Sequence, residues 1–303
     1  MHRRNFFKYM AALGLVSGAG RLILPEALWA MAPAETPQPL AAKVQGSNYA
    51  QLAGDAIKAL GGIKKFVNPG EVVVVKPNMA WDRPPEMAAN ANPQVVRQVV
   101  ELCLDAGAKQ VKVLDHTCHD ARKAYQNSGI KAAVEAIKDP RAVVEFVDER
   151  GFVEVNVEKA KALKKWYFYK PILEADRFIN IPIAKHHSEA RLTMCLKNMM
   201  GAIGGWRGRI HVGLHQNIAD MNLLLRPDLH VLDATRILLS NGPSGGRIED
   251  VAVKNLVFAG TDPVALDALG TGLFGLKPAD IGYIARSHQA GRGEMDLAKI
   301  KVV

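Results

Sequence analysis

Three lysines and two asparagines of this sequence could bind a small anion. Each of them stands beside an apolar segment. The lysines are Lys76, Lys185 and Lys197, and the asparagines are Asn78 and Asn198. Ammonium groups and side-chain amides supply the N–H donors that a carboxylate or a phosphate accepts. A surface lysine can instead lay its stem along apolar atoms and keep its ammonium in water. Lys197 lies among methionine, leucine and isoleucine residues, which favours a buried binding role for it.

The segment Leu196–Gln216 combines five glycines with apolar residues, and its sequence is LKNMMGAIGGWRGRIHVGLHQ. Gly201 and Gly204 are candidate ligand-binding residues, because without a Cβ their backbone N–H groups could approach an anion closely. The Walker phosphate-loop pattern is absent. We expect the stretch from Lys197 to Gln216 to form a glycine-hinged flap over the ligand, with Trp206 partly buried against the sheet.

Three further residues could move protons at such a site. They are Asp115, His116 and His186. Histidine titrates near neutral pH, which suits general acid–base chemistry. Cys118 could be a reactive thiol, although the sequence fixes no base beside it.

A divalent metal is a second candidate for the bound group. His211 and His215 are four residues apart and would share a helix face, with Asp220 about one turn further on. Histidine with carboxylate suits zinc or iron. The alternative is that these residues only brace the glycine-rich turn. An iron–sulfur cluster usually takes four thiolates, so this chain alone cannot hold a conventional one with its three cysteines, Cys103, Cys118 and Cys195. The sequence leaves the cofactor otherwise undetermined.

The elements that would position these residues follow from hydrophobic periodicity and from helix-capping residues. Strands are expected at 71–76, 110–115, 143–147, 177–183, 229–233 and 255–260, and helices at 49–60, 93–106, 121–137, 262–273 and from 278. Residues 150–172 are less regular. Alternating strands and helices predict an α/β fold with a mostly parallel sheet covered by helices on both faces. Two lobes are an alternative to one domain.

Five polar residues follow predicted strands directly. They are Lys76, Asp115, Lys185, Asp233 and Asp262. Ligands of open parallel sheets bind at the carboxyl ends of the strands. We therefore expect all five to lie along one edge of one sheet, where Asp233 and Asp262 would also take part in ligand binding.

Several blocks together resemble the family called domain of unknown function 362 (DUF362), over residues 68–290. The blocks include VVVVKPNMAWDRPPE, INIPIAKHH, LKNMMGAIGG, LHQNIADMNLLLRPDLHVLDA and FAGTDPVALDALG. Family members usually carry Lys-Thr-His where this chain has Lys185-His186-His187. Some carry a ferredoxin segment that is missing here, and this implies redox chemistry with a separate redox partner. The resemblance implies a fold and a site better than a reaction.

The start of the chain, MHRRNFFKYMAALGLVSGAG, resembles a twin-arginine (Tat) export signal. Ala32-Pro33-Ala34 places the cut before Glu35, which divides the chain into a leader, 1–34, and an α/β domain, 35–303. The resemblance implies the Tat translocase as a partner and a periplasmic or extracytoplasmic location. An uncleaved leader acting as a membrane anchor is the alternative.

Composition limits the classes of partner. The net charge is +9, with 49% hydrophobic and 23% charged residues, which describes a mildly basic globular protein. No basic stripe with interleaved aromatic residues occurs, so nucleic acid is not an expected partner. Two functions then remain. One is an enzyme or redox accessory protein that acts on a small anion. The other is a non-catalytic ligand-binding or assembly factor, or the partner of a separate iron–sulfur protein.

We expect that replacing Arg3 and Arg4 with lysine retains the protein in the cytoplasm, because the paired arginines define the export signal. Fractionation of cells that produce the wild type or the variant measures this. An unchanged periplasmic yield of the variant would contradict the export assignment.

Overall fold

The computed structural model describes residues 38–303. The predicted leader and its cleavage point lie outside these residues. No helix in the described part is long and apolar enough to cross a membrane.

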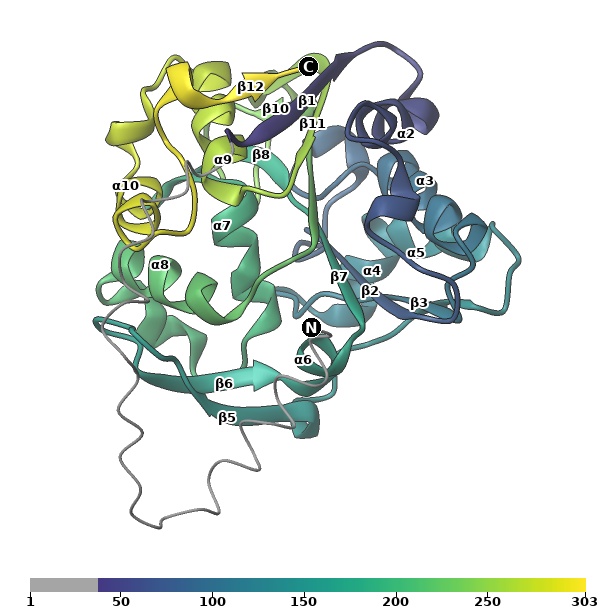
Figure 1. Cartoon of the computed structure of the whole chain (residues 1–303), viewed down its shortest axis with the longest axis horizontal. Coiled ribbons are helices and arrows are strands. Elements are labelled where there is room, and N and C mark those ends of the chain that lie inside the picture. Colours follow the sequence, from purple (N-terminus) through teal and green to yellow (C-terminus); the bar gives the residue numbers. More distant parts are fainter. Residues whose placement is uncertain (1–37) are drawn as a thin grey trace, which may run out of the picture.

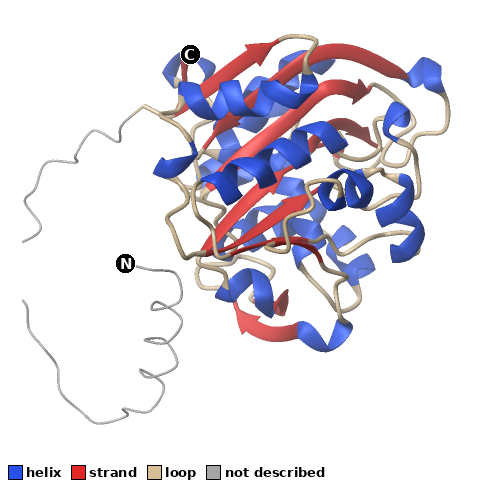
Figure 2. Cartoon of the chain, turned by 90° about the vertical axis from the view of Figure 1, so that its right-hand side faces the viewer, coloured by secondary structure: helices blue, strands red, loops and turns tan. Residues whose placement is uncertain are grey.

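Ten strands form one mixed sheet, which is the centre of the fold (Figures 1 and 2). Their bounds are β1 Leu40–Gln45, β2 Val72–Pro77, β3 Gln110–Val113, β4 Ala142–Val144, β7 Arg177–Ile181, β8 Ile183–His187, β9 Arg191–Thr193, β10 Leu229–Leu238, β11 Val251–Gly260 and β12 Lys301–Val302. The main order is β12-β1-β11-β10-β7-β2-β3-β4, and β8 pairs with β10 and β9. Strands β10, β7, β2, β3 and β4 run parallel. The predicted α/β fold with a mostly parallel sheet is confirmed.

Helices cover both faces of this sheet (Figure 1). One side carries α2 (Tyr49–Ala59), α3 (Pro93–Asp105), α4 (Ala121–Asn127) and α5 (Ile130–Glu135), and the other carries α6 (Lys170–Glu174), α7 (Cys195–Asn198), α8 (Leu214–Leu224), α9 (Pro263–Thr271) and α10 (Gly282–Gln289). Strand β2 explains why two cores form. Val73 and Val75 pack into the first core and Val74 packs into the second, because successive side chains of a strand alternate between faces. All three are fully buried, as expected for the continuous valine run.

Local signals fix several element ends. The side chain of Asn92 accepts a hydrogen bond from the Gln94 amide and caps α3, while Pro93 occupies the first helical position. The single helix expected over 121–137 is divided into α4 and α5. The break is at Gly129, whose φ of 73° lies in the left-handed region that glycine adopts most readily.

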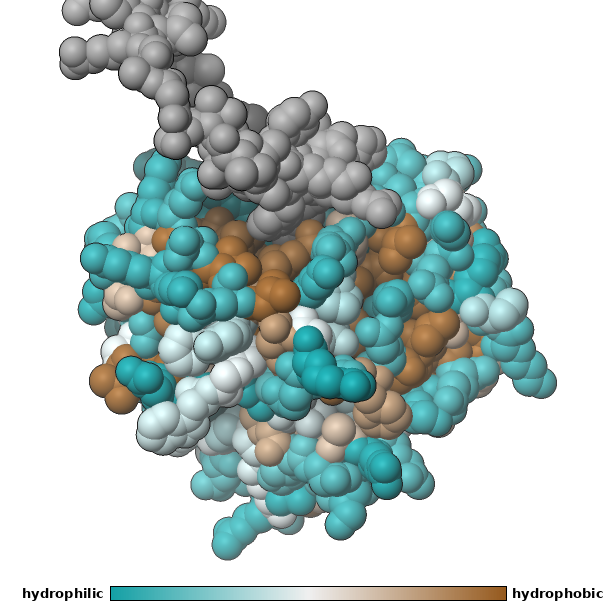
Figure 3. All heavy atoms as spheres, turned by 90° about the horizontal axis from the view of Figure 1, so that it is seen from below, coloured by the Kyte–Doolittle hydropathy of each residue, from teal (hydrophilic) through white to brown (hydrophobic). Residues whose placement is uncertain are grey.

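A separate two-stranded sheet occupies the region that looked irregular in the sequence. Strands β5 (Phe152–Asn156) and β6 (Lys165–Tyr169) form an antiparallel hairpin beside the main sheet (Figure 1). The Asp220 carboxylate ties its loop to α8, because it accepts hydrogen bonds from the backbone amides of residues 161–163. The molecular face in Figure 3 is hydrophilic over much of its area, with separate apolar patches between.

The direction of β11 corrects one part of the expected edge. Strand β11 runs antiparallel to β10, so Gly260 at its carboxyl end pairs with His230 near the start of β10. Asp262 therefore lies at the opposite edge of the sheet. Its carboxylate caps α9 by accepting bonds from the Val264 and Ala265 amides. The expectation that Asp262 shares the ligand edge is wrong.

Asp233 lies within β10 instead of at its end, because β10 continues to Leu238. The fully buried Asp233 carboxylate accepts hydrogen bonds from the backbone amides of Asn92 and Thr235. It braces the start of α3 against β10 and does not line the pocket described below.

Candidate functional site

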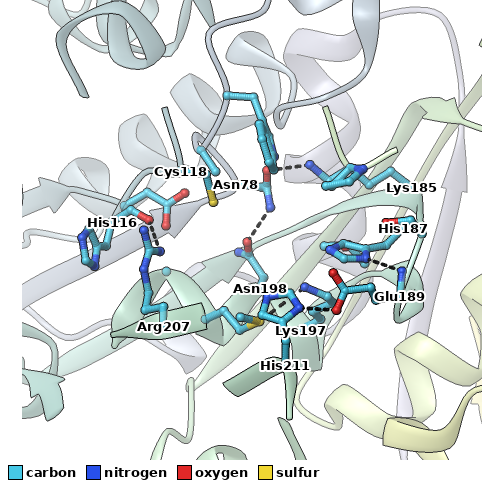
Figure 4. Close-up of a pocket in the computed structure, with 18 of the residues that line it drawn as sticks. Asn78, His116, Cys118, Lys185, His187, Glu189, Lys197, Asn198, Arg207 and His211 are labelled. Carbon is cyan, nitrogen blue, oxygen red and sulfur yellow. Dashed lines mark hydrogen bonds and ion pairs between the residues drawn. The ribbon is translucent and has the colours of Figure 1, made fainter. Parts of the chain in front are cut away.

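A pocket of about 400 Å³ opens at the carboxyl ends of β2 and β3 (Figure 4). The segments that follow these two strands form one part of its wall. The hairpin β8–β9, the stretch from Lys197 to His211 and Pro243 form the rest. Segments spread over residues 78–243 of the sequence therefore meet at the edge where ligands of parallel sheets bind.

A buried ion pair lies at the base of this site. Lys76 Nζ is 2.7 Å from Asp115 Oδ1, and both side chains are inaccessible to solvent. Burial lowers the pKa of Lys76, and the Asp115 charge opposes this effect. The other oxygen of Asp115 accepts a hydrogen bond from the Met79 amide. The ammonium of Lys76 thus has its counter-charge within the protein. The Asp115 carboxylate is occupied by its contacts with Lys76 and the Met79 amide.

The two candidate glycines allow close packing. A Cβ on Gly201 would lie 1.8 Å from Asp115 Oδ1 and 2.7 Å from Lys76 Nζ. A Cβ on Gly204 would lie 2.5 Å from the Phe152 ring. Gly201 lines the pocket and its carbonyl accepts a hydrogen bond from the His116 amide, whereas Gly204 packs against the β5–β6 hairpin. The absence of a Cβ is needed for the buried ion pair and for the hairpin contact.

Lys185 and Lys197 differ from Lys76, because neither has a carboxylate within ion-pair distance among residues 38–303. Lys185 Nζ donates to Ala89 O at 2.5 Å and to Asn78 Oδ1 at 3.2 Å, and it lies 5.6 Å from the centre of the Trp81 ring. Lys197 Nζ lies 3.3 Å from the Met200 sulfur. Burial lowers the pKa of Lys185 to about 7 and that of Lys197 to about 8.

Buried amides hold these lysines in place. Asn78 donates to Asn198 at 2.9 Å, and Asn198 donates to Asn180 at 2.8 Å. At the start of α7, the Asp267 carboxylate accepts hydrogen bonds from the amides of Cys195 and Leu196. Asn78 and Asn198 line the pocket, but the network also fixes the helix that carries Lys197.

The structure brings His187 into the pocket and leaves His186 outside it. Residues Ile183–His187 form a strand, so Lys185 and His187 share a face while His186 points to the other face. His186 Nδ1 accepts a hydrogen bond from the Gly242 amide. His187 Nδ1 accepts from the amides of Glu189 and Ala190, which places the ring proton on Nε2. Burial lowers the pKa of His187 to about 2, so the ring is neutral. Reading 183–187 as a strand would have revealed this alternation.

His116 lies at the pocket wall with both ring nitrogens engaged. Nδ1 lies 2.8 Å from Ile203 O, and Nε2 lies 3.0 Å from Glu149 Oε1. The ring donates both bonds only when both nitrogens carry protons. Arg207, which was not among the expected site residues, donates to the carbonyls of His116 and Thr117 and also lines the pocket.

The three candidate metal ligands have separate partners. His211 Nδ1 lies 2.6 Å from Glu189 Oε2, His215 stacks with Tyr283, and Asp220 binds the loop of the β5–β6 hairpin. Gln216 donates to Asp220 at 2.8 Å, as the bracing alternative requires. In the described part of the chain, no group of three or more His, Cys, Asp or Glu side chains is arranged to hold a metal ion.

The stretch from Lys197 to Gln216 forms one wall of the pocket, but Trp206 does not face it. The side chains of Met199 and Ile203 are fully buried, whereas Trp206 is 76% exposed. The preceding Gly205 has a φ of 67° and sits against Tyr167, which turns the chain outward at this point. The expectation that Trp206 packs against the sheet is wrong.

Comparisons with known proteins agree with the sequence motifs. The family described as Domain of unknown function (DUF362) matches residues 73–272. The thylakoid-associated protein sll1697 of Synechocystis sp. (strain ATCC 27184 / PCC 6803 / Kazusa) is 29% identical over 243 residues, which cover 78% of this chain and 73% of that protein.

Two solved structures are similar at 10% identity. One is a structural-genomics protein from Thermotoga maritima, with a TM-score of 0.41 and coverage of 81% of this chain and 60% of that one. The other is the lactate racemase apoprotein from Thermoanaerobacterium thermosaccharolyticum, with a TM-score of 0.40 and coverage of 76% and 56% respectively.

Gly201→Ala should lower the free energy of unfolding by about 3 kcal/mol, because the new methyl group would displace the Lys76–Asp115 pair. Gly246→Ala is the matched control, since a Cβ there meets no atom within 4 Å. Urea unfolding measures both variants. Equal stability of the two variants would contradict the tight packing at Gly201.

Proposed function

We propose that this chain, which belongs to the DUF362 family, binds a small carboxylate or phosphate in the pocket beside Lys185 and Lys197. The observation that carries the proposal is the burial of these two ammonium groups without a carboxylate partner in the described residues. Burying an uncompensated charge is unfavourable, and a bound anion would supply the missing counter-charge.

The pairing of the other charged groups supports the same conclusion. Of the two carboxylates that line the pocket, Asp115 is paired with Lys76, and Glu189 Oε2 lies 2.6 Å from His211 Nδ1. Arg207 donates hydrogen bonds to backbone carbonyls, which carry no net charge. Its positive charge therefore adds to those of the two lysines. A ligand entering from solvent therefore meets a positive pocket with a neutral N–H donor at His187 Nε2.

Export by the Tat route to the periplasm is part of this proposal and is supported by the Arg3-Arg4 start of the sequence. The same pocket would serve an enzyme and a non-catalytic ligand carrier equally well. A reactive group beside the anion would distinguish the enzyme from the carrier.

Lys197→Ala should weaken anion binding about ten- to a hundredfold, because a hydrogen bond to a charged group contributes about 1.5–3 kcal/mol. Titration calorimetry and melting curves with a set of small carboxylates and phosphates measure the change. Lys64→Ala, at an exposed position, is the matched control and should bind as the wild type does. If Lys197 has only a structural role, the variant melts at a different temperature but shows the same ligand-induced shift, and that result would refute the proposal.

Anion binding should also weaken as the pH rises. The pKa of Lys185 is about 7 and that of Lys197 is about 8, so both lysines lose their protons in the free protein above these values. Binding then requires proton uptake, because a bound anion favours the ammonium form. The affinity should be highest below about pH 7 and fall about tenfold or more by about pH 9. Acetate is the probe, since its own charge is constant over this range. An affinity independent of pH would show that neither lysine contacts the anion.

A further inference from the structure

Thr193 presents a buried hydroxyl group without a hydrogen-bond partner. Its side chain lines the pocket, the residue is only 4% exposed, and no atom of residues 38–303 forms a hydrogen bond with its Oγ1. A buried hydroxyl is rarely left unpaired in a native protein. The orphaned Oγ1 therefore indicates a position that a ligand or a water molecule completes.

The register of the β8–β9 hairpin places this hydroxyl beside the pocket lysine. Thr193 pairs directly with Lys185, so the two side chains share one face of the hairpin with His187. Lys185, Thr193 and His187 each have an N–H or O–H donor that no atom of the described residues accepts. The ammonium of Lys185 has three N–H groups and bonds to two protein oxygens, and the ring of His187 has a free Nε2–H. Lys197 from α7 lines the same pocket as these side chains.

Cys118 brings a thiol to the same pocket (Figure 4). Cys118 is exposed, whereas Cys103 and Cys195 are completely buried. Burial raises the pKa of both buried thiols. Lys185, Lys197 and Arg207 line the same pocket as Cys118. An accessible thiol in a pocket that also holds cationic side chains has the environment of a reactive cysteine.

We propose that Cys118 is a nucleophile for small anions that carry an electrophilic carbon, with the anionic group bound by Lys185, His187, Thr193 and Lys197. The proposal rests on the anion-binding function of the same pocket and adds a substrate class and a catalytic residue. In the step, the thiol proton passes to water and Sγ attacks the carbon. An S–C bond forms, and the leaving group departs with the electron pair of the bond that breaks. The displacement needs no oxidant or reductant.

Two alkylating reagents test this step directly. Iodoacetate carries a carboxylate and iodoacetamide is neutral, while both react by loss of iodide with formation of a thioether. Because both consume the same thiolate, the ratio of their rates is independent of the thiolate fraction and reports recruitment of the anion. We expect the iodoacetate-to-iodoacetamide ratio to exceed that of N-acetylcysteine by about tenfold or more, since a cationic cleft raises the local concentration of anions.

Matched variants connect the rate ratio to the subsite. Lys197→Gln and Thr193→Val should each bring the ratio toward the N-acetylcysteine value, while Lys64→Gln, at an exposed site, should leave it unchanged. Cys118→Ser should abolish labelling, with peptide mass spectrometry identifying the modified cysteine. Melting curves show that each variant is folded. A wild-type ratio equal to that of N-acetylcysteine, or labelling mainly at Cys103 or Cys195, would overturn the proposal.

A phosphate titration of Cys118→Ser separates this inference from the function on which it rests. Phosphate should raise the melting temperature of the wild type and of Cys118→Ser equally, because the serine variant retains the lysines and Thr193. If phosphate stabilises both proteins but iodoacetate shows no preference, the anion site stands and the nucleophile proposal fails. If phosphate has no effect and the ratio is ordinary, both fail.

Discussion

The site depends on one buried ion pair, between Lys76 and Asp115. Lys76 belongs to β2 and Asp115 follows β3, so the 2.7 Å contact joins the carboxyl ends of two neighbouring strands. Removing one partner would leave a buried charge without compensation, which is strongly unfavourable. The pair also requires the glycine at position 201, because any side chain there would occupy the space of the Asp115 oxygen. Pocket wall, strand ends and buried charges are thus parts of one packing arrangement.

Unlike Lys76, Lys185 and Lys197 have no carboxylate partner within ion-pair distance among residues 38–303. Their lowered pKa values reflect the work of burying an ammonium without a counter-ion. Below about pH 7 both lysines are charged in the folded protein, and this charge lowers the free energy of unfolding. Between about pH 7 and the unfolded-state pKa of about 10.4 the unfolded chain binds more protons than the folded one, so the free energy of unfolding rises with pH. Groups held in such unfavourable states occur most often at functional sites. The unpaired Thr193 hydroxyl and the accessible Cys118 thiol adjoin the same charges.

Much of the architecture could be predicted from local sequence. The valine run of β2 indicated a strand buried on both faces, and Asn92-Pro93 indicated the start of α3, because burial pattern and capping act within a few residues. Lys76, Asp115, Lys185 and Lys197 were correctly placed near the carboxyl ends of parallel strands or the segment that covers them. The glycine-rich stretch was correctly expected at the same place, although Gly201 and Gly204 are needed for packing against other side chains.

Tertiary structure decided the remainder, because strand direction and side-chain partners are set by segments distant in sequence. Asp262 follows a strand as Asp115 does, yet β11 pairs antiparallel with β10 and carries it to the other edge. Thr193 is brought beside Lys185 by the pairing of β8 with β9, which no local pattern of residues 183–193 made evident. Sequence by itself determined which residues could form strands and helices. Which side chains face the pocket depended on hydrogen bonding between strands, since one residue of register or a reversal of direction moves a side chain to the opposite face or edge.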